Sequence, residues 1–263
     1  MICLVRTLLT ACAVLYTEAL TVAGLAVRRV QPIATSPYVF EVDLLGSDAA
    51  SEVLREHDSL ASTFWPAGVP LARLLARMPG LGGATVLELG CGTGLCSLCA
   101  ASIGAGDVLA SDVEPVSLRL VEAARDAQLG AFPGLASLRT GSFDVLSSID
   151  ELPSVQVLIV SDLFVTSELA RAVARRVASA VQRGVVVLAV DPGRSSRADF
   201  LDELHQRGVE ASFEPEEALR LRMDSLRQAS QSSGGGRNGS GLPPPGGLFL
   251  CDTEEGAPLS YMI

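Results

Sequence analysis

Short apolar runs alternate with helical segments from residue 84 onward, and this alternation constrains the fold more than any other feature of the chain. Parallel neighbouring strands need a crossover connection, which is usually a helix. The pattern therefore predicts an α/β fold with a doubly wound, mostly parallel sheet of seven strands. The expected strands are residues 85–89, 107–111, 137–140, 155–161, 185–190, 209–213 and 248–252, and the expected helices are 70–78, 95–103, 115–128, 167–181 and 196–206.

The last strand follows a segment, residues 229–247, that consists mainly of Gly, Ser and Pro. Such a composition cannot bury enough apolar surface to order itself, so we expect a flexible insertion inside the domain. A hairpin that pairs residues 248–252 with 209–213 would make the last strand antiparallel.

Residues 1–29 differ from the rest of the chain. An apolar stretch from residue 8 to residue 27 follows Arg6 and contains one charged residue, Glu18. Its length approaches that of a membrane span, and its start is typical of a signal peptide. We interpret it as an N-terminal leader or extension that is removed, after which no membrane association is expected; residues 30–263 would form the domain.

A glycine-rich turn, Gly90, Gly92 and Gly94, directly follows one predicted strand and opens the next helix. Glycine permits positive φ and lets a ligand approach the main chain, and the helix N-terminus offers unpaired N–H groups. A dinucleotide fingerprint would need a further glycine where the chain has Leu95, and a phosphate-binding loop would need a lysine. Both alternatives fail.

The remaining pattern, Glu-x-Gly-x-Gly-x-Gly with Glu88 at its head, resembles motif I of class I S-adenosylmethionine (SAM)-dependent methyltransferases. The resemblance implies a Rossmann-like sheet, SAM as cofactor, and an acidic residue after the next strand that binds the ribose hydroxyls, here Asp112. It also implies that Asp144 contacts the adenine amine and that Asp162 faces the transferable methyl group as the catalytic residue. Helix capping or a turn is the alternative role for Glu88, Asp112 and Asp144.

Further segments narrow the resemblance. "FWPAGVPLARLL" precedes motif I, "SDLFV" follows the fourth strand and "DPGR" follows the fifth. In this order they resemble the lysine methyltransferases of the electron-transfer flavoprotein β-subunit, in which the region around Trp65 packs beside SAM. Asp191 and Arg194 are then expected to bind the substrate, with a structural turn and a mutual ion pair as the alternative.

One position departs from the wider lysine methyltransferase group. That group has Asp-x-x-Tyr where this chain reads Asp162-Leu163-Phe164-Val165, so a tyrosine hydroxyl is missing. The departure keeps open a methyltransferase for a small molecule or a ribosomal protein, and a non-catalytic SAM-binding protein.

Composition limits the partners. The formal net charge of −10 argues against nucleic acid, because nucleic-acid binders usually carry a basic face. The spacing of Cys91, Cys96 and Cys99 occurs in iron–sulfur proteins, but here these residues lie on an apolar helix and its turn, so no metal is expected. The resemblance implies a protein substrate that bears a lysine. The leader and the resemblance predict the mitochondrial matrix, with the cytoplasm as the alternative; the oligomeric state is not predicted.

Overall fold

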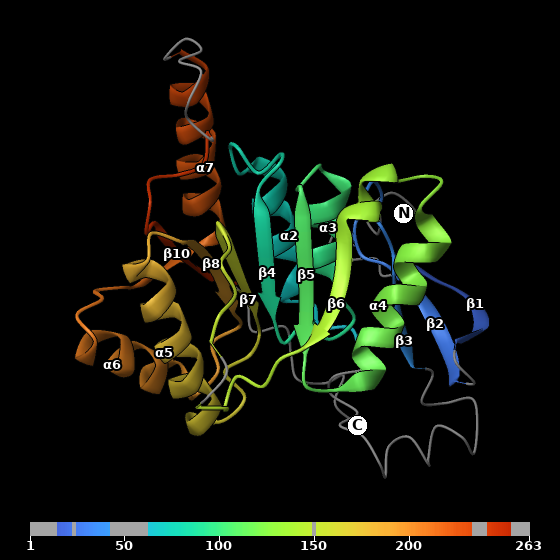
Figure 1. Ribbon diagram of the computed structural model, residues 1–263, viewed down its shortest axis with the longest axis horizontal. Helices are drawn as coiled ribbons and strands as arrows, with labels where there is room; N and C mark the ends of the chain where they lie inside the picture. The colour runs from blue at the N-terminus through green and yellow to red at the C-terminus, as the bar shows by residue number, and fades with distance from the viewer. Residues whose placement is uncertain (1–14, 23–24, 43–62, 149–150, 233–240, 254–263) are drawn as a thin grey trace, which may run out of the picture.

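The computed structural model describes residues 15–22, 25–42, 63–148, 151–232 and 241–253, and it contains two sheets (Figure 1). The larger sheet has seven strands in the order β6-β5-β4-β7-β8-β10-β9, and every neighbouring pair in it is parallel. Its strands are β4 (Thr85–Leu89), β5 (Asp107–Asp112), β6 (Leu138–Ser142), β7 (Val157–Ser161), β8 (Val186–Asp191), β9 (Phe213–Pro215) and β10 (Leu248–Asp252). The predicted α/β fold with a doubly wound parallel sheet is confirmed.

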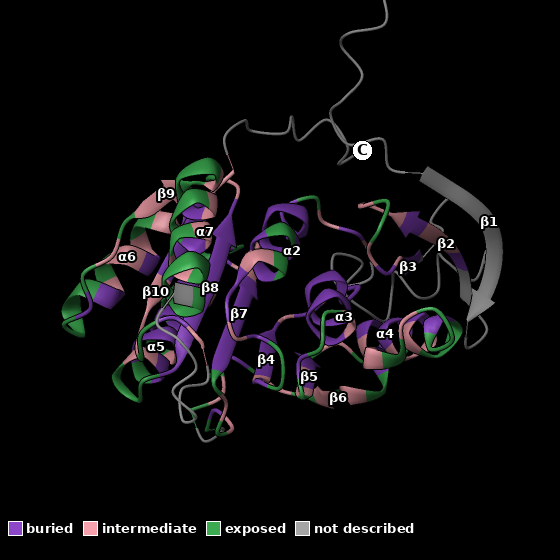
Figure 2. Cartoon of the chain, turned by 90° about the horizontal axis from the view of Figure 1, so that it is seen from above, coloured by how far each residue is buried: buried purple, intermediate pink, exposed green. Residues whose placement is uncertain are grey.

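Helices cover both faces of this sheet. They are α2 (Gly68–Arg77), α3 (Leu95–Ser102), α4 (Pro115–Gln128), α5 (Ser167–Gln182), α6 (Arg197–Gln206) and α7 (Glu216–Ser232), with a short 3-10 helix, η1 (Pro133–Ser137). Figure 2 shows α2, α3 and α4 together on one side of the strands. Helix α7 joins the core of that side, whereas α5 and α6 pack on the other.

The sequence produces this two-sided core because successive strand residues point to opposite faces. On β4, Val86 belongs to the core beneath α2, α3 and α4, whereas Leu87 and Leu89 belong to the core beneath α5. Buried on both faces, β7 and β8 consist of apolar runs without alternation, as expected for central parallel strands.

The direction of the last strand corrects one expectation. Strand β10 runs parallel to both of its neighbours, β8 and β9, so the predicted antiparallel hairpin is wrong. The reason is helix α7, which lies between β9 and β10 in the chain. A connection that contains a helix returns the chain to the starting end of the sheet, and the next strand then runs parallel.

The predicted insertion is only partly described. Residues 229–232 form the last turn of α7, and residues 241–247 lead into β10. Residues 233–240 lie outside the described ranges. The expected strand at 209–213 is also displaced, because β9 begins at Phe213.

The N-terminal segment forms the smaller sheet, which is antiparallel: β1 (Leu15–Val22), β2 (Leu25–Gln31) and β3 (Val39–Val42). The expected boundary between residues 29 and 30 falls inside β2, and the removal of a leader stays a prediction. Gln128 of α4 joins this sheet to the main domain, because its amide bonds both the N–H and the carbonyl of Tyr38 at 2.8 Å. No helix in the described ranges is long and apolar enough to cross a membrane. Residues 1–14 and 43–62 lie outside those ranges.

Candidate active site

The glycine turn lies between β4 and α3, at the carboxyl edge of the sheet, and its backbone needs glycine. Gly90, Gly92 and Gly94 have φ of 61°, 50° and 78°, in the left-handed region. Space is also limited: a Cβ on Gly94 would lie 2.4 Å from Val121 Cγ2, and one on Gly90 would lie 2.6 Å from Leu163 Cδ1. The turn thus presents the main chain of three residues without side chains, directly before the N-terminus of α3.

Glu88, on β4, is buried and caps helix α3. One of its carboxylate oxygens accepts hydrogen bonds from the Ser97 N–H at 2.9 Å and the Ser97 hydroxyl at 2.5 Å. Burial raises the pKa of Glu88 to about 7, and the bonds from Ser97 oppose this rise. These contacts are those of the helix-cap alternative; a contact between Glu88 and SAM stays a prediction.

Asp112 ends β5 and fastens the glycine turn. Its two carboxylate oxygens accept the N–H groups of Gly92 and Glu114, each at 2.9 Å. Burial raises the pKa of the Asp112 carboxyl, and the backbone hydrogen bonds oppose this. Each carboxylate oxygen can accept a second bond, so Asp112 keeps acceptor capacity for a sugar diol.

Asp144 follows β6, next to Asp112 along the same edge. The Phe143 N–H donates to the Asp112 carbonyl at 3.2 Å, so the two loops touch. Asp144 is exposed, and its side chain accepts the Leu146 N–H at 2.8 Å, as in an Asx turn. The structure thus shows the turn alternative for Asp144, whereas a contact between Asp144 and adenine stays a prediction.

A second cluster gathers three residues from distant parts of the chain. Asp162 follows β7, and its side chain pairs with Nε of Arg194, which follows β8. The guanidinium carbon of Arg194 lies 5.5 Å from the ring centroid of Trp65, just before α2. Trp65 is only partly buried and lies at the carboxyl edge of the sheet. This position argues against a purely structural role in the core, which the size of the side chain alone would favour.

Asp191 plays a structural part beside this cluster. It is fully buried, and one oxygen accepts the N–H groups of Gly193 at 2.8 Å and Arg194 at 3.0 Å, and Nε of Arg197 at 2.8 Å. These bonds support a structural turn rather than a direct substrate contact. The expected ion pair between Asp191 and Arg194 is wrong, because the Arg194 side chain pairs with Asp162 instead.

Sequence reasoning missed Arg197. Its guanidinium bonds Asp191 and, at 3.0 and 3.1 Å, Asp252 of β10, and it stacks on Phe213 with 4.2 Å to the ring centroid. An arginine at the start of a helix is ordinary, so nothing local marked it. The one available signal for a cationic partner was Asp252, the acidic residue at the end of the predicted last strand.

The segment after Asp162 has three different environments. Leu163 lies against Gly90, Phe164 is fully buried and stacks on Phe200 at 4.2 Å between centroids, and Val165 is exposed. The position where the wider group has tyrosine thus reaches the surface beside Asp162.

The cysteines behave as core residues. Cys91, Cys96, Cys99 and Cys251 are buried free thiols, and burial raises the pKa of Cys99 to about 12. In the described part of the chain, no three His, Cys, Asp or Glu side chains are placed to hold one metal ion. A cavity of about 270 Å³ between α2, α3 and α7 lies at the opposite edge of the sheet, away from these residues.

The donor set at the carboxyl edge fits SAM. The cofactor has no phosphate, so its site needs no cluster of cations. The edge offers the main chain of three glycines and the Asp112 carboxylate, whose free acceptor capacity suits a ribose diol. In open α/β sheets, ligands bind at this edge.

Together, the sheet order and this edge define a Rossmann-like protein with a site whose donor groups fit SAM. The family model described as "Lysine methyltransferase" matches residues 53–206, more than half of the chain. The chain belongs to the lysine methyltransferase family.

Individual relatives agree with this assignment. The electron transfer flavoprotein beta subunit lysine methyltransferase of Danio rerio is 29% identical over 144 residues, which cover 54% of this chain and 53% of the relative. The protein of the same name from Xenopus laevis is 30% identical over 141 residues, covering 52% and 54%. The chain thus spans about half the length of the curated relatives it matches.

Solved structures give a more distant comparison. A TehB-like SAM-dependent methyltransferase from Corynebacterium glutamicum is 18% identical and superposes with a TM-score of 0.41, over 63% of this chain and 84% of the other. An arsenic(III) SAM methyltransferase from Chlamydomonas reinhardtii is 17% identical with a TM-score of 0.41, over 53% and 61%.

Proposed function

We propose that this chain is a protein-lysine N-methyltransferase that uses SAM, with the electron-transfer flavoprotein β-subunit as the first substrate to test. The observation that carries the proposal is the position of Asp162. Its carboxylate lies on the same edge as the glycine turn, and Leu163, the next residue, lies against Gly90. The family and the names of the relatives supply the substrate class.

In this proposal the cofactor-binding residues and Asp162, which lie along the same edge of the sheet, have different roles. The glycine turn and Asp112 hold the cofactor, which when bound supplies a methyl group on a sulfonium leaving group. Asp162 orients the substrate amine by a hydrogen bond, and its carboxylate is the acceptor, directly or through water, for the proton that the amine must lose. That loss is necessary because a lysine amine has a pKa near 10.4 in water. Burial at the edge excludes water from the reacting groups.

A non-catalytic SAM-binding protein is the second candidate, and Val165 is the observation that favours it. Its isopropyl group cannot donate the hydrogen bond that a tyrosine would offer a lysine. This candidate predicts SAM binding without methyl transfer to any protein. A small-molecule or ribosomal-protein methyltransferase instead predicts transfer to those substrates and not to the flavoprotein subunit.

The test is methyl transfer from labelled SAM to the purified flavoprotein β-subunit, followed by mass spectrometry of the product. The chain itself contains no lysine, so methyl-lysine in the assay comes only from the substrate. Asp162→Asn should lower kcat about 100-fold and leave SAM affinity unchanged. Full turnover by this variant would refute the role of Asp162.

The cofactor site has a matched pair of variants on one strand. Asp112→Asn should weaken SAM binding at least tenfold, because it removes charge-assisted hydrogen bonds. Asp107→Asn removes the same charge at the other end of β5, where Asp107 pairs with Arg139 at the surface, and should leave SAM affinity unchanged. Equal effects of the two substitutions in calorimetry would contradict the assignment.

The proposal includes the mitochondrial matrix as the place of action, in line with the expected leader. Microscopy of the full chain with a C-terminal fluorescent tag tests it, and a signal spread through the cytoplasm would refute this part alone.

A further inference from the structure

Arg194 is enclosed by two groups that attract cations. Its guanidinium carbon lies 5.5 Å from the centroid of the Trp65 ring, and its Nε donates to the Asp162 carboxylate. An aromatic face attracts a cation through its quadrupole, and a carboxylate attracts it through its charge. The ring and the carboxylate are therefore the two walls of a cation site that is filled by a side chain of the protein itself.

The walls of this site are fixed in place. Asp162 has φ of 52°, a left-handed conformation that is strained for a residue other than glycine. Its N–H donates to the Val190 carbonyl at 2.9 Å, which holds the strained residue against β8. The Asp162 side chain is only 5% exposed, so its carboxylate faces the Arg194 guanidinium and very little solvent. Strain held in this way is characteristic of functional sites.

The Arg194 guanidinium makes fewer hydrogen bonds than that of its neighbour Arg197. In the described part of the chain the Arg194 side chain makes one hydrogen bond, through Nε. The neighbouring Arg197 bonds two carboxylates through three nitrogens. The backbone of Arg194 is anchored by Asp191, but the side chain is a flexible stem that is 20% exposed. Arg194 can thus leave the site without disturbing the turn that carries it.

We propose that the Trp65 ring and the Asp162 carboxylate form the entry site for the cationic side chain of the substrate, and that this side chain enters by displacing Arg194. The Arg194 side chain then competes with the substrate side chain for this site, and only a cation that can replace Arg194 binds there. The identity of the incoming side chain, a lysine, rests on the proposed function; the cation site does not.

The experiment uses Trp65 as its own reporter, because it is the only tryptophan of the chain. The full chain, without cofactor, is titrated with n-butylammonium at constant ionic strength while the tryptophan fluorescence is recorded. The apparent affinity for the probe is the intrinsic affinity multiplied by the fraction of molecules in which Arg194 does not occupy the site. Arg194→Ala should therefore bind the probe about tenfold more tightly than the unaltered chain, and Arg194→Gln, which keeps most of the stem, should do the same.

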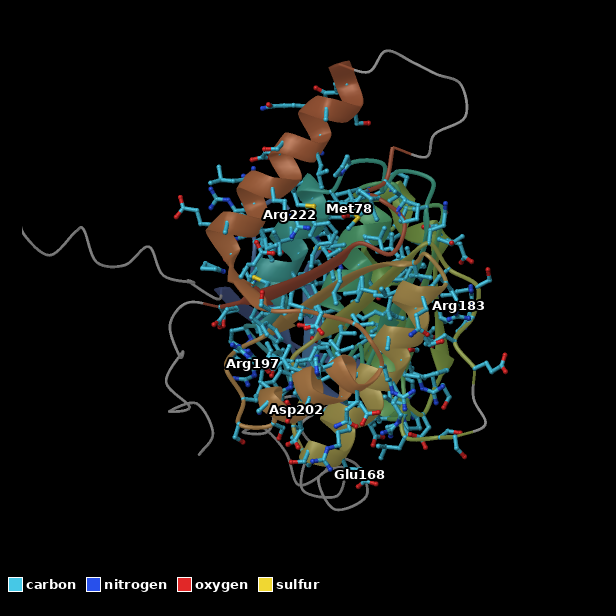
Figure 3. All side chains as sticks on the ribbon, turned by 90° about the vertical axis from the view of Figure 1, so that its left-hand side faces the viewer. Met78, Glu168, Arg183, Arg197, Asp202 and Arg222 are labelled. Atoms are coloured by element: carbon cyan, nitrogen blue, oxygen red, sulfur yellow. The ribbon has the colours of Figure 1, made fainter. Side chains whose placement is uncertain are left out.

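The control is Arg222→Ala. Arg222 has a comparable pair of contacts, since it lies 4.6 Å from the centroid of the Phe249 ring and bonds Glu214 at 2.8 Å. Figure 3 shows it on helix α7, well separated from the position of Arg197. Its loss should leave the fluorescence titration unchanged. The double variant Asp162→Asn with Arg194→Ala should lose the gain in affinity, because one wall has lost its charge.

Unchanged probe affinity in both Arg194 variants, or an equal gain in Arg222→Ala, would overturn the proposal. n-Butanol, which is neutral and of nearly the same shape as the probe, should not compete in any variant, and competition by it would also refute a cation site. Methyl transfer is measured separately. Absent transfer with intact cation binding refutes only the proposed function, whereas transfer without a change in cation affinity refutes only this inference.

Discussion

Replacing Glu88 by Gln should change how the stability of the protein depends on pH. Glu88 is 2% exposed and its carboxyl caps α3 through Ser97. Burial raises its pKa from 4.5 to about 7 in the folded chain. Glutamine has nearly the same shape and an oxygen that accepts the same bonds, but it does not titrate.

The sign follows from proton binding. Between pH 4.5 and pH 7 the folded chain holds the proton of Glu88 and the unfolded chain releases it, so this residue stabilises the fold at low pH. The contribution is fully present below pH 4.5 and is lost as the pH rises through 7. At about 1.4 kcal/mol for each pH unit that separates the two pKa values, the loss amounts to about 3 kcal/mol.

The free energy of unfolding, measured with urea at pH 5, 6, 7 and 8, provides the test. Relative to the unaltered chain, Glu88→Gln should gain about 2 to 3 kcal/mol of stability from pH 5 to pH 8, most of it below pH 7. Burial also raises the pKa of Asp112 and of Asp162, but both residues are present in both proteins, so their titration largely cancels in the difference. A difference between Glu88→Gln and the unaltered chain that does not vary with pH would show that this carboxyl is not the buried, proton-holding cap described above.

Three further substitutions test the packing around the site by chemical unfolding. Gly94→Ala should cost about 3 kcal/mol, because it adds a steric collision to the strain of positive φ. Gly104→Ala, at φ of 101° with open space around the Cβ, should cost only about 1 kcal/mol, and equal costs would refute the collision. Arg197→Met should cost about 3 kcal/mol or more, because it leaves the fully buried Asp191 without its cation; a loss below about 1 kcal/mol would show that Asp191 does not need the pair.

Local signals carried much of the fold. The strand predicted at 85–89 is β4, and the helix predicted at 115–128 is α4. Both predictions depend on the spacing of apolar residues and on the glycine and proline residues that interrupt helices and strands. These signals act within a few residues. The glycine turn belongs to the same class, because its positive φ values are a property of each residue. Helix α7 carried an equally local signal in the spacing of Leu219, Met223 and Leu226, and the prediction passed over it.

The N-terminal segment shows where local signals end. An apolar stretch of its length is compatible with a leader, a membrane span or strands, because composition does not specify the partner that buries it. In the structure, β1 and β2 pair with each other, and β3 completes a sheet that packs on α4.

The chain by itself therefore determined the order of strands and helices, the glycine turn, and the acidic residues that follow successive strands. Parallel strands then bring those residues to one edge, which is a geometric consequence of the order. Tertiary structure alone decided the direction of β10, the burial of Asp191 by Arg197, and the meeting of Trp65, Asp162 and Arg194. The physical reason is that these contacts join segments far apart in sequence, and their partners are selected by packing and charge in three dimensions, which no local periodicity records.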